Sequence, residues 1–234
     1  MTVDFDLHGR VLVRLLDAPA AAVSAVTADT GIRPGPATAA APTITVEFTD
    51  DLHLAEPVRR VGRTSGFAGS QFVVGDSPGR RCVVALGTSA DFTLRAERAV
   101  RHVPHLLALV NIAMLRAGAL PLHAAALLTP GGGLVVTGWS KGGKTETVLG
   151  LMSRGATFVA DEWCYLDPVQ RVVLGLRHPI RVWDWQLAQL PVLRAKLTTK
   201  QRARLAVTSR VTGPSGLRSR TLRTMLEPTR GVTM

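Results

Sequence analysis

The chain has 234 residues, of which 46% are hydrophobic and 19% are charged, and this balance excludes an intrinsically disordered chain. The length suits one large or two small globular domains. The net charge of +11 is uneven, because residues 1–175 hold 16 Lys and Arg against 15 Asp and Glu and nearly all the excess lies in residues 176–234. We expect this basic C-terminal region to attract an acidic partner. The alternative is an Arg-rich solvated surface without a partner.

Targeting and membrane signals are lacking. Cys82 and Cys164 lie inside apolar runs without metal-binding spacing, so we expect reduced, buried thiols and a cytoplasmic protein. The acidic start has no apolar core of a signal peptide. The most apolar stretch, 106–128, contains Arg116 and Pro121, and its uncharged part is too short to cross a bilayer. We therefore expect no membrane partner.

The first 100 residues predict a small α+β module. Ile44, Val46 and Phe48 alternate with polar residues, which is typical of a half-buried strand. A longer helix is predicted over 95–118, interrupted at Pro104. The histidines and acids of the module are scattered, and we expect no catalytic site there. The other elements predicted in this region are strands at 10–16, 43–48, 71–74 and 81–86 and a helix at 19–28.

The second predicted domain spans 101–234, after a module at 1–100. It opens with a hairpin, because apolar runs at 122–128 and 134–137 flank TPGGG. With the turn centred on Gly131, His123 would lie opposite Trp139, although a slip of one residue would turn it to the other face. Near the end of the chain, a further helix is predicted at about 199–207.

Residues 138–145, GWSKGGKT, fit the phosphate-loop pattern G-x-x-x-x-G-K-[ST] between a predicted strand and a predicted helix. Backbone amides and the helix N-terminus suit bound phosphate. Lys144 is expected to reach the β- and γ-phosphates, and Thr145 to bind Mg²⁺. Lys141 adds charge at the γ-phosphate or points to solvent, and Trp139 stacks on a base or walls the substrate pocket. The expected nucleotide-binding residues are Gly138, Trp139, Ser140, Lys141, Gly142, Gly143, Lys144, Thr145 and Glu146.

Two acids follow the next predicted strand, 156–160. One of Asp161 and Glu162 would hold Mg²⁺, and the other would take the proton from an attacking hydroxyl.

The order of His123, the phosphate loop, a short helix, RGATFVAD and the acid pair resembles the catalytic domain of the HPr kinase/phosphorylase family, which is related to phosphoenolpyruvate carboxykinase. The match covers about 120–168 and continues more weakly to about 185. The resemblance implies an α/β fold of α+β character, with His123, Lys144, Asp161 and Glu162 in the catalytic site. It implies that Asp161 joins Thr145 on the metal and that Glu162 is the base. It also implies that His123 is oriented toward the phosphates or the acid pair. It also implies a homo-oligomer, commonly a hexamer.

This chain departs from the family in two places. Glu162 stands where the bacterial regulators have Asp, and GLRHPIRVWDW (175–185) replaces their following signature. Arg177 and Arg181 in that segment are expected to clamp phosphate or an acidic substrate, or else to be surface arginines.

These features and the resemblance predict an ATP- and Mg²⁺-dependent kinase acting on a Ser or Thr hydroxyl of a peptide or protein. The chain is also similar to HPr-kinase-like proteins of biosynthetic clusters, which implies a substrate such as a lasso-peptide precursor. A small-molecule kinase on the same scaffold and a nucleotide-binding regulator without transfer activity are the alternatives. A nucleic-acid-associated ATPase is disfavoured, because the basic region lacks interleaved aromatic residues.

Overall fold

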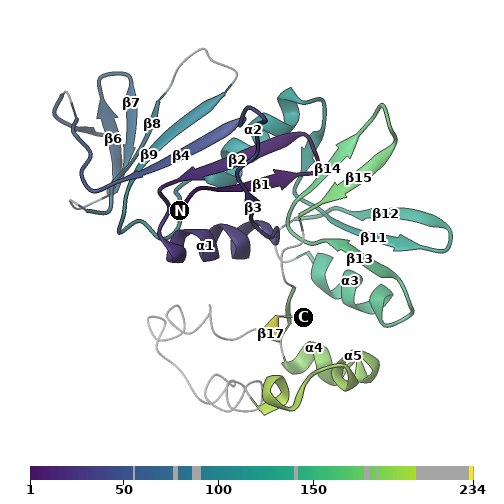
Figure 1. Ribbon diagram of the computed structural model, residues 1–234. Coiled ribbons are helices and arrows are strands. Elements are labelled where there is room, and N and C mark those ends of the chain that lie inside the picture. The colour runs from purple at the N-terminus through teal and green to yellow at the C-terminus, as the bar shows by residue number, and fades with distance from the viewer. Residues whose placement is uncertain are drawn as a thin grey trace. The chain divides into compact units, whose positions relative to one another are not determined.

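A computed structural model describes residues 1–54, 56–75, 79–85, 91–139, 142–176, 180–182, 184–203 and 232–233. They form a mixed α/β structure of α+β character, with several sheets and helices (Figure 1). The chain divides into two compact units, unit 1 (1–121 and 165–174) and unit 2 (122–164 and 175–234). No helix in the described part has the length and apolar content that a bilayer crossing requires.

Unit 1 is built on a sheet that has nine strands among the described residues, in the order β3-β1-β2-β4-β9-β8-β7-β6-β5. The neighbours β2, β4 and β9 run parallel, and the other pairs are antiparallel. The parallel pair β2 and β4 is joined through helix α1 (Ala20–Thr30), as a parallel connection requires. The strands are β1 (Val3–Leu7), β2 (Val11–Leu16), β3 (Gly35–Pro36), β4 (Ile44–Thr49), β5 (Arg59–Arg60), β6 (Ser65–Ala68), β7 (Gln71–Val74), β8 (Cys82–Ala85) and β9 (Phe92–Glu97).

One face of this sheet is apolar and forms the core of unit 1. Cross-strand partners share a face, so Leu15, Val46 and Leu94 line up across β2, β4 and β9, and all three are fully buried. Helix α2 (Leu106–Arg116) covers this face, since the Arg116 guanidinium lies 4.9 Å from the ring centroid of Phe92. Helix α2 therefore belongs to unit 1, which continues to residue 121. The domain boundary that was expected after residue 100 falls inside this unit.

The elements predicted for the first 95 residues are observed within about two residues of their expected ends. The helix predicted over 95–118 is wrong before residue 106. Residues 95–97 are instead the end of strand β9, in which Phe92, Leu94 and Ala96 alternate with polar residues and pair with β4 and β8. Strand β1 was not predicted, although its sequence VDFDL alternates apolar and polar residues as a half-buried strand does.

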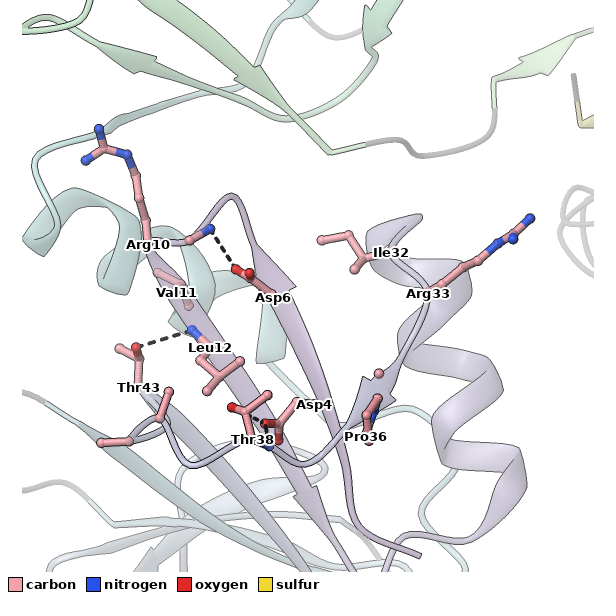
Figure 2. A pocket seen from close by; sticks show the side chains of 14 residues that line it. Asp4, Asp6, Arg10, Val11, Leu12, Ile32, Arg33, Pro36, Thr38 and Thr43 are labelled. Carbon is pink, nitrogen blue, oxygen red and sulfur yellow. Dashed lines mark hydrogen bonds between the residues drawn. The ribbon is translucent and has the colours of Figure 1, made fainter.

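A shallow cavity of about 580 Å³ lies in unit 1 beside β1 and β2. Figure 2 shows Asp4 and Thr38 facing each other there, while Arg33 extends away. The buried Asp4 carboxylate accepts two bonds from the Arg14 guanidinium, at 2.8 Å each, and further bonds from the Thr38 amide and hydroxyl. Asp6 accepts from the amide of Gly9. Both carboxylates are therefore engaged in hydrogen bonds within unit 1.

A three-stranded sheet among the described residues has the order β10-β14-β15 and comprises β10 (Leu120–Leu122), β14 (Cys164–Asp167) and β15 (Val172–Gly175). The buried Tyr165 donates its hydroxyl to Asn111 Oδ1 at 2.9 Å, which ties β14 to α2. Arg10 forms an ion pair with Asp167. Both cysteines are free and buried, as predicted, and burial raises the thiol pKa to about 12 for Cys82 and about 11 for Cys164.

Unit 2 contains a three-stranded sheet, among its described residues, of β12 (Gly132–Val136), β11 (Ala125–Thr129) and β13 (Thr157–Ala160), in that order. Helix α3 (Lys144–Met152) packs on it, with Val148 and Leu149 buried against Leu127. Helices α4 (Asp184–Ala188) and α5 (Pro191–Ala195) add Leu187 and Leu193 to this core. Strand β16 (Arg181–Val182) pairs with β17 (Val232–Thr233). Residues 199–203 are helical, and the rest of the helix predicted to 207 lies outside the described residues.

Candidate functional site

Three segments of unit 2 meet at one edge of the sheet. Strands β12 and β13 both run antiparallel to β11, so they are parallel to each other and their carboxyl ends share an edge. The phosphate-loop sequence follows β12, and Asp161 follows β13 at that edge. His123 comes just before β11, whose amino end lies at the same edge. The fold thus gathers His123, the loop and the acid pair from separate parts of the sequence.

The loop is shaped by glycines where it enters α3. Gly143 has a φ of 87°, a left-handed conformation that favours glycine, and α3 begins at Lys144. The Gly142 amide donates to the Trp139 carbonyl at 2.9 Å, and a Cβ built on Gly142 would lie 2.9 Å from that oxygen. Any side chain at position 142 would therefore push the turn open. The free amides of the first turn of α3 suit an anion.

Lys144 lies over the loop that precedes it. Its Nζ donates to the Gly138 carbonyl at 3.1 Å and lies 3.5 Å from the Trp139 carbonyl, and the residue is only 9% exposed. The two carbonyls therefore hold the Lys144 ammonium over the loop. The neighbouring Trp139, by contrast, is 90% exposed.

Thr145 and Asp161 join the loop helix to the strand end. The Thr145 hydroxyl donates to Asp161 Oδ2 at 3.2 Å, and Asp161 is 6% exposed. Burial raises the pKa of Asp161, and the charge of Glu162 adds to this, whereas the Thr145 hydroxyl and the Lys144 charge oppose it. A hydroxyl and a buried carboxylate at this distance are oxygen donors of the kind that Mg²⁺ prefers, so the pair fits a hard cation.

Glu162 adopts an unusual backbone conformation. Its φ is 79°, a left-handed value that is rare for a residue with a side chain, and its amide donates to Asp161 Oδ1 at 3.1 Å. The side chain is 63% exposed, and its Oε2 lies 3.0 Å from His123 Nε2. The His123 ring packs against Trp163, with 5.5 Å between the ring centroids. This geometry holds a solvent-facing carboxylate beside the buried Asp161.

The predicted register of the hairpin is wrong by one residue. Thr129 pairs with Gly132 across a two-residue turn, Pro130–Gly131, so the turn is tighter than the one centred on Gly131. His123 lies in a bend between β10 and β11 rather than in a strand opposite Trp139. From that bend its ring contacts Glu162, so His123 faces the acid pair, which is one of the two orientations that the resemblance implied.

The buried Gln186 was missed by sequence reasoning. Its Nε2 donates to Glu146 Oε1 at 2.9 Å, which ties α4 to the first turn of α3. Glu146 was expected near the nucleotide, and its carboxylate is engaged by this bond. A single glutamine in DWQLAQL carries no sequence signal for such a role, because the contact depends on how α4 packs.

Ser140, Lys141 and Arg177 lie outside the described residues, as do Trp183 and most of the basic C-terminal region. Arg181 is described only as a backbone position in β16.

Comparisons of the chain with protein-family models, with curated proteins and with solved structures return no match. What the site does is therefore inferred from its residues and their geometry. Together these offer an anion cradle, an oxygen pair for a hard cation, and an exposed carboxylate beside a histidine.

Proposed function

We propose that the protein is an ATP- and Mg²⁺-dependent kinase that transfers the γ-phosphoryl group to a Ser or Thr hydroxyl of a peptide or protein. The observation that carries the proposal is the 3.2 Å hydrogen bond between Thr145 and Asp161, because it joins the phosphate-loop helix to the acid pair. A phosphate loop alone would hold a nucleotide. A phosphate loop with a buried and an exposed carboxylate beside it can also activate an acceptor.

On the donor side, the loop amides and Lys144 bind the phosphates. Their positive charge stabilises the negative charge on the transferring group. Thr145 and Asp161 are the residues that would hold Mg²⁺, and the metal would supply charge neutralisation at the β- and γ-phosphates. A nearby cation would favour the ionised form of the buried Asp161, whose pKa is raised by its environment.

On the acceptor side, Glu162 takes the proton of the attacking hydroxyl. The acceptor oxygen forms a bond to the γ-phosphorus, and the bond from that phosphorus to the bridging oxygen of ADP breaks. The electron pair of the broken bond leaves with ADP, and the proton passes from Glu162 to solvent. His123 orients the Glu162 carboxylate through the 3.0 Å contact of its Nε2.

The open acceptor side favours a peptide or protein over a small molecule. Glu162 has a side chain that is 63% exposed, and Trp139 beside the loop is 90% exposed. Small-molecule sites usually enclose most of their ligand, whereas this surface leaves room for a chain to lie across it.

The family-level features belong to the same proposal. The order of His123, loop, short helix and acid pair on one sheet edge supports a fold like that of the HPr kinase and phosphoenolpyruvate carboxykinase catalytic domains. The proposal also includes that the enzyme is a cytoplasmic homo-oligomer and that its basic C-terminal region binds an acidic partner.

The test incubates the protein with γ-labelled ATP, Mg²⁺ and a library of Ser- and Thr-containing peptides. Wild type should label peptides, and Lys144→Ala should abolish the label. Leu128→Ala, an exposed apolar truncation on β11, is the matched control and should label as wild type does. ATP turnover without a labelled peptide would contradict the proposal and favour a regulator or a small-molecule kinase.

A further inference from the structure

Trp139 has a side chain without an evident packing role. Of the large apolar side chains in the described part of the chain, it is the most exposed, at 90%. Indole rings bury large areas in cores and interfaces, so a solvated one on a functional loop is a candidate contact for a ligand.

The backbone of Trp139 is fixed although its ring is exposed. Its carbonyl accepts the 2.9 Å bond from the Gly142 amide and lies 3.5 Å from Lys144 Nζ. The Trp139 carbonyl leaves no room for a Cβ at Gly142. The indole therefore projects from a constrained point, and little backbone entropy would be lost on binding.

The neighbours of Trp139 decide which ligand it meets. On the proposed function, Lys144 contacts the terminal phosphates, so a residue whose carbonyl lies beside Lys144 Nζ stands at the γ-phosphoryl end of the nucleotide. The base lies at the opposite end, beyond the remaining phosphates and the ribose. Stacking of Trp139 on the base is thus disfavoured, and contact with the acceptor is favoured.

A second aromatic ring lies next to the proposed base. Trp163 packs on His123, whose Nε2 contacts the Glu162 carboxylate. Trp163 thus places an indole ring near the proposed base, while Trp139 adjoins Lys144 through its carbonyl. Indole faces recognise aromatic, aliphatic and prolyl groups.

We infer that Trp139 determines acceptor specificity, by packing against an apolar residue adjacent to the acceptor Ser or Thr of a peptide. This inference rests on the proposed kinase function. It narrows the substrate class to peptides in which the acceptor hydroxyl has an apolar neighbour in the chain.

The test uses synthetic peptides that carry one Ser and vary one flanking position at a time among aromatic, aliphatic, prolyl, glycyl and charged residues. Transfer from γ-labelled ATP is measured for wild type, Trp139→Ala and Trp139→Phe, with Leu128→Ala as the control for loss of an exposed apolar side chain. Wild type should prefer the best apolar neighbour over glycine by about tenfold or more in kcat/KM. Trp139→Ala should reduce that preference to about twofold, and Trp139→Phe should keep most of it. The Kd for ATP should stay within about twofold of wild type in every variant.

Three results would overturn the inference. If Trp139→Ala labels peptides with the same preference for apolar neighbours as wild type, the role of Trp139 in acceptor specificity is refuted and the kinase proposal stays intact. A tenfold weaker Kd for ATP with unchanged peptide preference would place the indole on the base instead. If wild type labels no peptide, the kinase proposal fails and the inference fails with it.

Discussion

Glu162 has a backbone conformation that a glycine would adopt at lower cost, and this gives a prediction about stability. At a φ of 79°, a β-carbon costs roughly 1–2 kcal/mol, whereas glycine loses roughly 0.5–1 kcal/mol more chain entropy on folding than alanine. The difference leaves Glu162→Gly more stable than Glu162→Ala by about 1 kcal/mol. Both variants lack the carboxylate and its contact with His123, so their comparison isolates the backbone conformation. Both should lose peptide phosphorylation.

Urea unfolding followed by tryptophan fluorescence measures this difference in unit 2, because all four tryptophans belong to that unit. Thr147, exposed in α3, gives the matched control at an ordinary helical position. There the order reverses, and Thr147→Ala should be more stable than Thr147→Gly by about 1 kcal/mol. If Glu162→Ala equals or exceeds Glu162→Gly in stability, the left-handed conformation is not strained and the reasoning is refuted.

Three further predictions concern a buried carboxylate in each unit and the loop. The Arg14 guanidinium lowers the pKa of Asp4 from 3.8 to about 2, so the ionised carboxylate contributes about 2 kcal/mol of stability. This contribution is complete above about pH 4 and is lost as the pH falls towards 2. Urea unfolding followed by circular dichroism should therefore show a smaller loss of stability in acid for Asp4→Asn than for wild type, and an equal loss would contradict this. Burial raises the pKa of Asp161, so ionisation of this carboxyl costs stability as the pH rises above about 4. Asp161→Asn should therefore raise the free energy of unfolding at about pH 7 by an amount that vanishes below about pH 4, and a loss of stability at neutral pH would contradict this. Gly142→Ala should weaken ATP binding by about tenfold or more in Kd by calorimetry, because the added Cβ would lie 2.9 Å from the Trp139 carbonyl oxygen. Gly150→Ala is the control, because a Cβ at Gly150 in α3 meets open space, and it should bind ATP as wild type does. Equal ATP affinities in the two variants would refute this prediction.

The sequence predicted the elements whose signals are local. Alternation along 43–48 and the flanking of GWSKGGKT by a strand and a helix are properties of a few adjacent residues. The end of strand β9 was taken for helix, because its pairing with β4 and β8 depends on residues about fifty and about ten positions away. Tertiary pairing overrode local propensity there.

Within the site, residue types were easier to predict than contacts. The identity of Lys144, Thr145 and the acid pair follows from motif and spacing, and the structure brings Thr145 and Asp161 together. The contact of His123 with Glu162 joins the bend before β11 to the residue pair after β13, and spacing along the hairpin does not reveal such a contact. The contact of Gln186 with Glu146 could not be predicted from the sequence, because it depends on how α4 packs against α3.

The most direct test of the proposed function compares wild type with Glu162→Gln, which keeps the shape of the side chain and removes its basicity. Each protein is incubated with ATP, Mg²⁺ and the Ser/Thr peptide library, and phosphopeptides are measured by mass spectrometry, with the Kd for ATP from calorimetry. We predict equal ATP affinity and a loss of about 100-fold or more in phosphopeptide formation for Glu162→Gln. Formation at the wild-type rate by Glu162→Gln, or no phosphopeptide from wild type, would contradict the account.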